Sequence, residues 1–391
     1  MTLSRWFTCA LAGMAAVALS HPVAAQDANK AGAPIKVGVL NSLTGPVAGY
    51  GLPQVDGVKL FFEALNASGG INGRPVELVI RDDQSSPQVA VTQLQGLMND
   101  PSTVAVLGPA SSNSVNALKP ITHREKISLI MYASAAQLAV GPEADYLYRT
   151  QHSDRVLIDA LVGTVKNRLS GATLGVMYSE DAYGANGIET VKTAAESMGL
   201  KIVSVESFQT TETDMAVQAA RMKSAEPDAI IVMATVPGAA YVIRALGQVG
   251  ASMPVLGPQL MVDARIPQLA GEAAEGVMFA AQIAPDDPAP GAQLELAEKW
   301  RASYGKEMTA PGIPGYSSAM VLSEALSVLV SGGKDVTRET VHEALNAVDV
   351  ETPGGRMAYT AEDHDGPKAD SAIIGTIRDG KFVRWSEDKK Q

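Results

Sequence analysis

Cysteine is nearly absent from this chain. Its 391 residues include a single cysteine, Cys9, which lies in an apolar N-terminal segment. One positive charge at Arg5, an apolar stretch over residues 6–20 and small residues up to Ala25 are typical of a signal peptide cleaved after Ala25. Too little apolar sequence precedes Cys9 for a lipoprotein signal. The expected mature chain therefore has no disulfide, no thiol nucleophile and no thiolate metal site.

Long apolar runs are also scarce. Residues 6–20 are shorter than the ~20 residues that a membrane-spanning helix needs, and no stop-transfer pattern follows them. No later segment reads as apolar enough to span a bilayer. We therefore expect residues 1–25 to be a removed signal peptide rather than a retained anchor helix, and the mature protein to be periplasmic. An exported chain of this length can build a core without disulfides.

Basic side chains are in deficit. The full sequence has 31 Lys and Arg against 42 Asp and Glu, and removal of residues 1–25 leaves 30 against 42, a net charge of −12. An acidic protein is a poor partner for nucleic acid or for an anionic membrane surface. The mature length predicts two domains, or two lobes of one domain.

The motifs of common enzymes and cofactor sites are missing. Gly45, Gly49 and Gly51 follow the first predicted strand but lack the spacing of a dinucleotide-binding fingerprint, and we find no Walker loop or nucleophile elbow. His342-Glu343 has no second histidine at a zinc-binding distance. We therefore expect a protein that is not an enzyme and has no cofactor, metal site or catalytic residue; an enzyme with dispersed residues is the less favoured alternative. The four mature histidines read as scattered: His123, His152, His342 and His364.

Short apolar strands alternate with amphipathic helices along much of the chain. This alternation predicts an α/β fold of βαβ units, with parallel-rich sheets buried on both faces. The predicted strands cover residues 35–40, 76–80, 104–107, 128–132, 174–178, 201–207, 229–233 and 255–256. The predicted helices between them cover residues 54–68, 87–99, 112–125, 156–169, 184–198, 215–225 and 238–249.

The strand pattern pauses once, at residues 147–154, and then begins again. Two similar doubly wound halves explain this better than one large sheet does. A third section follows, and Asp379-Gly380 predicts a hairpin turn between strands at 372–377 and 381–385. The helices predicted in this section cover residues 292–304, 317–331 and 338–347.

Several local strings occur in the order typical of one protein family. The most specific are the turn Gly-Gly-Ile-Asn-Gly-Arg at 69–74 and the loop Gly-Pro-Ala-Ser-Ser at 108–112. With them, nearly the whole mature chain resembles the type I periplasmic solute-binding proteins of the leucine/isoleucine/valine-binding family, which are substrate-binding components of ABC transporters. The supporting strings lie at 35–39, 43–46, 49–51, 82–83, 183–184, 257–259 and 316.

The resemblance implies two Rossmann-like lobes joined by a three-crossing hinge. The expected N-lobe is residues 34–148 plus 281–348, and the expected C-lobe is residues 149–280 plus 349–386. Such proteins capture a small molecule between the lobes, close on it by a hinge movement, and dock on a permease in the cytoplasmic membrane. We expect a monomer. A sensory ligand-binding protein with the same fold is the alternative, because a fold alone does not decide between the two roles.

Ala110, Ser111 and Ser112 follow the third predicted strand and open a helix. In open α/β sheets, ligands sit beyond the carboxyl ends of the strands. Serine hydroxyls and free N–H groups at a helix N-terminus suit a carboxylate, and the resemblance implies a carboxylate contact at Ser111 or Ser112. Capping of the helix by either serine is the structural alternative, and capping and binding can coexist.

The loop Ala133-Ser134-Ala135 resembles the segment that holds the ligand's head group from the other side. The family often has a hydroxyl where this chain has Ala135, so backbone groups and Ser134 would have to compensate. Tyr50, expected on the loop after the first strand, and Tyr183 resemble aromatic walls from the two lobes. A surface turn for Tyr50, and core packing for Ala133 to Ala135 and for Tyr183, are the structural alternatives.

Two positions depart from the amino-acid binders of the family. Gln259 stands where they have an acid that pairs with the ligand's ammonium, and Val236 stands where they often have a tyrosine. An unpaired buried ammonium is costly. The sequence therefore favours a carboxylate ligand without an α-ammonium, such as an aromatic, keto or hydroxy acid, or else an amide. A branched-chain amino acid is the alternative ligand, because Asp181 or Asp263 could supply the acid.

Three further residues are weaker ligand-binding candidates. His152 and Gln151 lie in the first expected crossing between the lobes, where a histidine could contact an anion or simply be a solvated hinge residue. Tyr316 opens a predicted helix of the third section.

Overall fold

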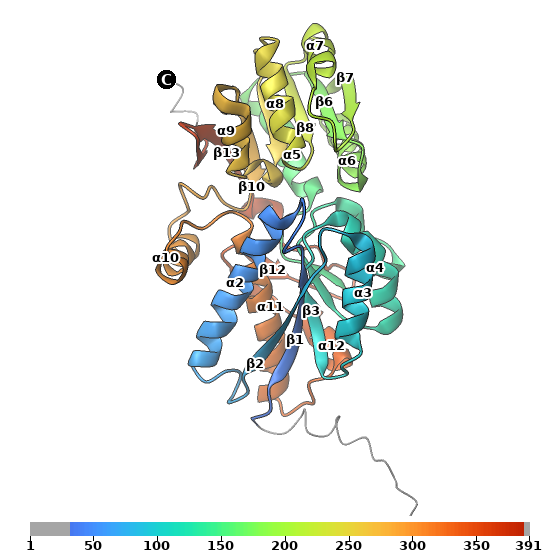
Figure 1. The fold of residues 1–391 in the computed structure, drawn as a ribbon, viewed down its shortest axis with the longest axis vertical. Helices are drawn as coiled ribbons and strands as arrows, with labels where there is room; N and C mark the ends of the chain where they lie inside the picture. The colour runs from blue at the N-terminus through green and yellow to red at the C-terminus, as the bar shows by residue number, and fades with distance from the viewer. Residues whose placement is uncertain (1–31, 387–391) are drawn as a thin grey trace, which may run out of the picture.

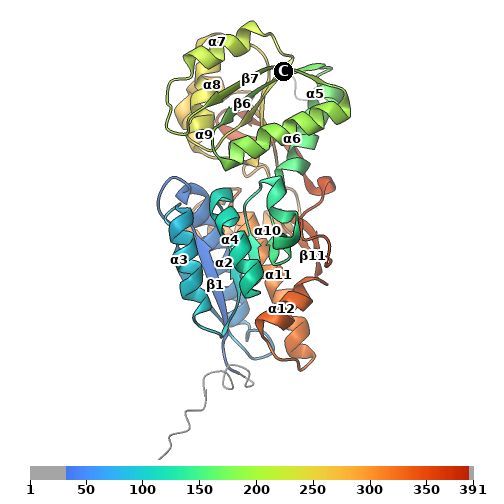
Figure 2. The same ribbon diagram turned by 90° about the vertical axis from the view of Figure 1, so that its right-hand side faces the viewer.

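Residues 32–386 are described by a computed structural model, without the side chain of Asp370. The predicted signal peptide, residues 1–25, and its cleavage site lie outside these residues. Two lobes stack along the long axis, and each is a twisted sheet with helices on both faces (Figures 1 and 2). The predicted α/β class with two lobes and parallel-rich sheets is confirmed.

The first lobe is built on a five-stranded sheet. Its strand order is β2-β1-β3-β4-β5, and all of the pairings are parallel. Runs of Val, Leu and Ile form β1 and β3, which are almost fully buried, as expected for a sheet covered on both faces. The strands are β1 (Ile35–Asn41), β2 (Val76–Asp82), β3 (Thr103–Leu107), β4 (Leu129–Met131) and β5 (Leu147–Arg149); the helices between the first four are α2 (Ala48–Ala67), α3 (Pro87–Met98) and α4 (Ser112–Glu125).

Three later helices return to this lobe: α10 (Ala292–Tyr304), α11 (Gly312–Ser331) and α12 (Arg338–Leu345). Helix α11 packs directly on α2 (Figure 1), and a Cβ at Gly315 would collide with the backbone of Gln54, so only glycine permits this approach. By length and composition α11 resembles a membrane span, which corrects the sequence-based expectation. Because 67% of its apolar window is buried inside the protein, it is a core helix.

The second lobe contains a seven-stranded sheet of order β14-β13-β10-β9-β8-β6-β7. The predicted hairpin around Asp379-Gly380 is confirmed, and it joins β10 in an antiparallel arrangement. The strands are β6 (Thr173–Ser179), β7 (Lys201–Phe208), β8 (Ala229–Met233), β9 (Val255–Pro258), β10 (Met278–Ala281), β13 (Ile373–Arg378) and β14 (Lys381–Arg384). The helices are α5 (Asp154–Arg168), α6 (Ala182–Met198), α7 (Ala216–Ser224), α8 (Gly238–Gln248) and α9 (Arg265–Ala270).

The chain passes between the two sheets three times: after β5, after β10, and before β13. A short hairpin of β11 (Asp349–Thr352) and β12 (Gly355–Ala358) precedes the third passage and packs on α11. Met357 and Tyr359 belong to the core of the first lobe. The expected C-lobe segment 349–386 is therefore divided, since its first part lies with the first lobe. The other lobe boundaries stay a proposal.

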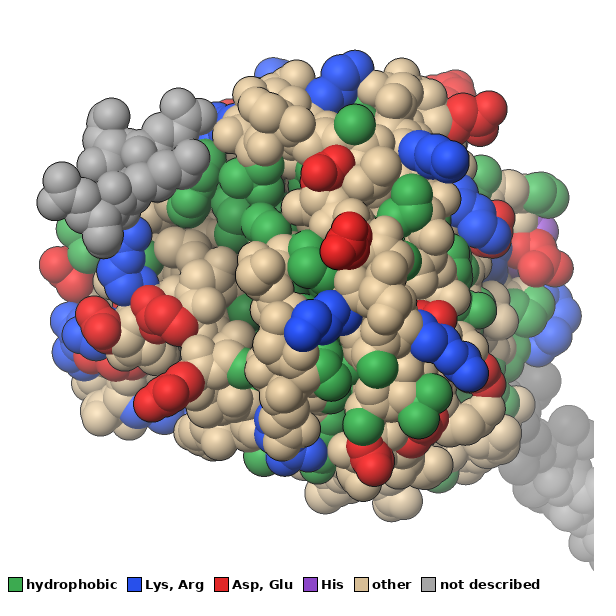
Figure 3. Space-filling view, turned by 90° about the horizontal axis from the view of Figure 1, so that it is seen from above, with side chains coloured by type: hydrophobic (Ala, Val, Ile, Leu, Met, Phe, Trp, Pro, Cys, Tyr) green, Lys and Arg blue, Asp and Glu red, His purple; other side chains and the backbone are tan. Residues whose placement is uncertain are grey.

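Acidic and basic side chains are interspersed over the outer end of the second lobe, and neither sign forms a continuous patch on its visible described part (Figure 3).

Three of the four histidines expected to be scattered lie near one another beside β5. His342 stacks on Tyr146 with ring centroids 4.1 Å apart, and His123 and His364 lie at 6.5 Å or less from the Tyr146 and His342 rings, respectively. Among the described residues, no group of three or more His, Cys, Asp or Glu could hold a metal ion.

Candidate functional site

A cleft of about 410 Å³ lies between the lobes. Residues that follow the carboxyl ends of β1, β3 and β4 form its first-lobe wall, and residues that follow β6 to β9 form its second-lobe wall. This is the edge at which ligands sit in open α/β sheets. Nine of the residues predicted from the sequence line it: Tyr50, Ala110, Ser111, Ser112, Ser134, Gln151, Tyr183, Val236 and Gln259.

The other four predicted residues do not line the cleft. Ala133 and Ala135 are buried in the first-lobe core. The His152 Nε2 atom lies 3.2 Å from the Lys368 carbonyl oxygen and 2.9 Å from the Ser371 hydroxyl, which places this ring in the hinge. Tyr316 packs edge-on against Phe61 with ring centroids 5.3 Å apart.

The N-terminus of α4 opens on the cleft. Ser111 is its N-cap, and the Ser111 hydroxyl accepts a long hydrogen bond of 3.4 Å from the Ser114 N–H. The preceding loop is held in place because the Ala110 N–H donates to Asn41 Oδ1 at 3.0 Å. No acidic residue lies in the first turn of α4, so the positive end of the helix dipole faces the cleft uncompensated by its own helix. This end of the cleft suits an anion.

Tyr50 lies in the first turn of α2, not on a loop. The helix begins six residues before its predicted start and contains Pro53 as its sixth residue. Two hydrogen bonds tie the preceding loop to the end of β2: Leu43 N–H donates to Asp82 at 2.9 Å, and Val47 N–H donates to Ser85 at 3.0 Å.

Two polar atoms of the second-lobe wall are buried without a well-formed hydrogen bond among residues 32–386: the Gln259 Nε2, and the Tyr183 hydroxyl oxygen, which lies beside the Asp154 carboxyl. A buried polar group without a partner costs about 1–3 kcal/mol. Polar atoms left unpaired in a cleft are positions where a ligand can supply the missing partner. The Gln259 Nε2 can only donate, so its partner must be an acceptor.

Asp154 is a buried acid that the sequence analysis missed. It is 1% exposed, its Oδ1 has no hydrogen-bond partner in the described chain, and its Oδ2 accepts from the Ser134 hydroxyl at 3.2 Å. Burial raises the pKa of Asp154 to about 7. Burial and the nearby Asp154 charge also raise the pKa of Tyr183 well above its ordinary value. An acid at the start of a predicted helix is normally interpreted as a capping residue, so the sequence gives no signal for another role.

Asp181 and Asp263, the two acids that the sequence offered as partners for a ligand ammonium, already have hydrogen-bond partners. Asp181 lines the cleft, but its Oδ1 accepts from the Gly184 N–H at 2.8 Å as the N-cap of α6. Asp263 accepts two charge-assisted hydrogen bonds from Arg265, with Nε–Oδ1 and Nη2–Oδ2 distances of 2.9 and 2.6 Å. Asp154 is therefore the least satisfied of the three carboxyl groups.

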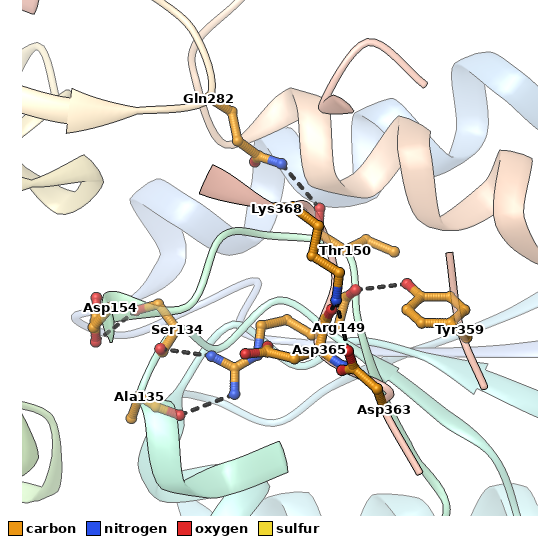
Figure 4. A network of polar contacts seen from close by, with 10 residues as sticks. All are labelled: Ser134, Ala135, Arg149, Thr150, Asp154, Gln282, Tyr359, Asp363, Asp365 and Lys368. Carbon is orange, nitrogen blue, oxygen red and sulfur yellow. Dashed lines mark hydrogen bonds and ion pairs between the residues drawn. The ribbon is translucent and has the colours of Figure 1, made fainter. Parts of the chain in front are cut away.

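A fully buried arginine holds the loop that follows β4 (Figure 4). Arg149 Nη1 donates to the Ser134 carbonyl oxygen at 2.7 Å, and Nη2 donates to the Ala135 carbonyl oxygen at 3.0 Å. The Arg149 Nε lies 3.0 Å from Asp365 Oδ1, and the Tyr359 hydroxyl donates to the Arg149 carbonyl oxygen at 2.6 Å. The cleft loop is thus fixed by β5 and by the third connection between the lobes.

A family model described as "Periplasmic binding protein" matches residues 34–381. The chain is 27% identical over 362 residues to a leucine-, isoleucine-, valine-, threonine- and alanine-binding protein of Pseudomonas aeruginosa, covering 91% of each chain. Two solved structures share the fold. One is a leucine-binding protein of Thermotoga maritima, with 21% identity, a TM-score of 0.80 and coverage of 90% of this chain and 98% of the other. The other is a branched-chain amino acid transporter substrate-binding protein of Streptococcus pneumoniae in complex with isoleucine, with 24% identity, a TM-score of 0.79 and coverage of 89% and 97%.

Proposed function

Because the chain belongs to the type I periplasmic binding proteins of the leucine/isoleucine/valine-binding family, we propose that it is the substrate-binding component of an ABC importer. It would act in the periplasm after cleavage of residues 1–25, as a monomer that delivers its ligand to a membrane permease. Its relatives are named as binding proteins, which supports a binding role rather than catalysis. The nine cleft-lining residues predicted from the sequence are the proposed ligand contacts.

The ligand we propose is a small apolar amino acid. The observation that carries this proposal is the N-terminus of α4, which presents Ser111 and Ser112 to the cleft and has no acid in its own first turn. The nearest acid, buried Asp83, accepts from the Ser114 hydroxyl at 3.1 Å. The helix N-terminus suits the ligand's carboxylate. Val236 and Ile283 add apolar wall to the cleft, which suits an aliphatic side chain. The name of the Pseudomonas relative includes leucine, isoleucine and valine, which supports the same ligand class.

The ligand's ammonium needs a counter-charge that neutral Gln259 does not supply. Asp154 is the proposed source, because its carboxyl lies directly behind Ser134 and perturbs Tyr183, and both of these residues line the cleft. A carboxylate near the ammonium lowers the cost of burying that charge.

A second candidate ligand is a carboxylate without an ammonium, such as a keto, hydroxy or aromatic acid, or else an amide. The Gln259 Nε2 favours it, since this buried donor has no acceptor in the described chain. A keto or hydroxyl oxygen can accept that hydrogen bond, whereas an ammonium cannot.

Titration calorimetry on the mature protein separates the two candidates. Leucine and 4-methyl-2-oxopentanoate have the same carbon skeleton and differ only at the α-position, and benzoate adds an aromatic acid. Tighter binding of leucine supports the amino-acid reading, and tighter binding of either acid supports the second. A thermal-shift screen of the same compounds adds a check, because a ligand at 100 times its Kd adds about 2.7 kcal/mol of stability. If none of them binds, both candidates fail.

A further inference from the structure

A direct contact between the two lobes is made at the cleft. Tyr50, in the first turn of α2, is only 5% exposed, and its hydroxyl donates to the Leu260 carbonyl oxygen of the second lobe at 3.2 Å. The Arg265 guanidinium carbon lies 5.9 Å from the centroid of the Tyr50 ring. A cation at this distance over an aromatic face is attracted by the ring.

Arg265 is held in position by Asp263, a residue of its own lobe. Its Nε and Nη2 atoms form a fork on the Asp263 carboxylate, and its backbone N–H donates to Asp263 Oδ1 at 2.8 Å. The Asp263 side chain is 10% exposed, so water competes little for this pair. A bidentate pair fixes the plane of the guanidinium as well as its place.

The first lobe leaves room for this guanidinium. A Cβ at Gly49 would lie 2.8 Å from Arg265 Nη2, so a side chain at this position would collide with the guanidinium unless the guanidinium moved. Gly49, Tyr50, Leu260, Asp263 and Arg265 together form what we term the interlobe latch. Arg265 and Asp263 are not among the residues that line the cleft.

We propose that Arg265 is a positioning residue that stabilises the lobe-closed state through Gly49 and Tyr50 and so slows ligand release without contacting the ligand. The proposal rests on the binding role proposed above, but not on the identity of the ligand. A ligand enclosed by both lobes binds the closed state, so its apparent affinity follows the fraction of molecules that are closed. Removal of the latch lowers that fraction.

The test measures the distance between the lobes without added ligand. The mature chain has no cysteine of its own, so two cysteines can be introduced for spin labels, at exposed Gln95 on α3 and exposed Val217 on α7. Pulsed electron resonance on the mature protein then reports the distance distribution. We expect Arg265→Ala to shift the population toward longer distances. An unchanged distribution overturns the proposal.

Arg244→Ala is the matched control. Arg244 lies 4.9 Å from the centroid of the Tyr241 ring, so it makes the same kind of contact entirely within the second lobe. We expect its distance distribution to match that of the parent protein. Tyr50→Phe removes the hydroxyl that contacts Leu260 and Arg265 but keeps the ring. It keeps the test usable if Arg265→Ala does not fold, and it should give a smaller shift in the same direction.

A kinetic measurement with leucine as the probe adds a second readout. We expect Arg265→Ala to release leucine roughly two- to fivefold faster with little change in the association rate, from the usual strength of an exposed cation–π contact. Arg265→Lys should recover part of this effect because it keeps the charge but not the planar fork. If Arg265→Ala lengthens the distance between the lobes but leucine does not bind the parent protein, the proposed ligand is wrong and the proposed role of the interlobe latch is supported.

Discussion

Asp154 is bonded to Ser134 twice. The Asp154 N–H donates to the Ser134 carbonyl oxygen at 2.7 Å, and the Asp154 carboxylate accepts from the Ser134 hydroxyl at 3.2 Å. The first residue of α5 in the second lobe is thereby joined to a cleft loop of the first lobe. A charge at this junction therefore lies where a cleft loop meets the first connection between the lobes.

Replacement of Asp154 by Asn tests its proposed counter-charge. The side chain keeps its size and can still accept from Ser134, but it loses the negative charge. We expect leucine binding to weaken about tenfold or more, since hydrogen bonds to charged groups contribute about 1.5–3 kcal/mol. Binding of 4-methyl-2-oxopentanoate should not weaken. Asp159→Asn on the same helix is the control, and equal effects of the two substitutions in calorimetry would contradict the role of Asp154.

The same variant should change how stability depends on pH. The pKa of Asp154 is raised to about 7 in the folded protein by burial, which outweighs the opposing effect of Arg149, whereas the unfolded side chain titrates near 3.8. Between these values the unfolded state releases its proton first, so wild-type stability is lost as the pH rises toward 7.

Asn at this position does not titrate, so the stability of the variant relative to wild type should increase by roughly 2–4 kcal/mol from pH 4 to pH 8. Urea denaturation without ligand at both pH values measures this difference. A difference that stays constant with pH would show that the carboxyl is ionised throughout.

Gln259 should control the choice between amino acids and acids without an ammonium. Gln259→Glu places an acid on the cleft wall, so we expect leucine binding to tighten about tenfold and binding of 4-methyl-2-oxopentanoate to weaken. Gln259→Leu is the neutral control and should weaken the keto acid alone. Calorimetry of both ligands on both variants gives the answer, and loss of leucine binding in Gln259→Glu would place the ammonium elsewhere.

Arg149 and Asp365 should contribute unequally to stability. Arg149→Lys cannot reach two carbonyl oxygens and a carboxylate at once, so we expect a loss of about 2–3 kcal/mol from buried groups left without a donor. Asp365→Asn keeps an acceptor oxygen for the fully buried Arg149 Nε and removes only the negative charge, so we expect a smaller loss of about 1 kcal/mol, the usual difference between a hydrogen bond to a charged group and one to a neutral group. Urea denaturation measures both losses. Equal losses would mean that the ion pair, and not the carbonyl contacts, holds the loop.

The alternation of apolar strands and helices predicted the architecture well, because buried parallel strands have a strong apolar pattern. It missed β5 and β10, which have three and four residues and no long run to detect. It also placed residues 349–359 in the wrong lobe, because which core a short hairpin joins is decided by tertiary packing on α11.

The site was predictable where it lies at the ends of strands, and not where it depends on contacts between distant segments. Ser111, Ser112 and Gln259 follow strands and line the cleft as predicted. Ala133 and Ala135 follow a strand too, yet they are buried and only the backbone of this loop is held, by Arg149. Nothing local to residue 50 indicates that Arg265 lies over its ring.

The packing of α11 on α2 has a consequence for how the protein is made. Helix α2 leaves the ribosome early, but the helix that covers it comes some 250 residues later, after most of the second lobe. The second lobe is incomplete too, because β13 and β14 are translated last. Neither lobe can finish folding before these later segments have been synthesised. The order of the elements along the chain therefore delays completion of both cores until late in synthesis.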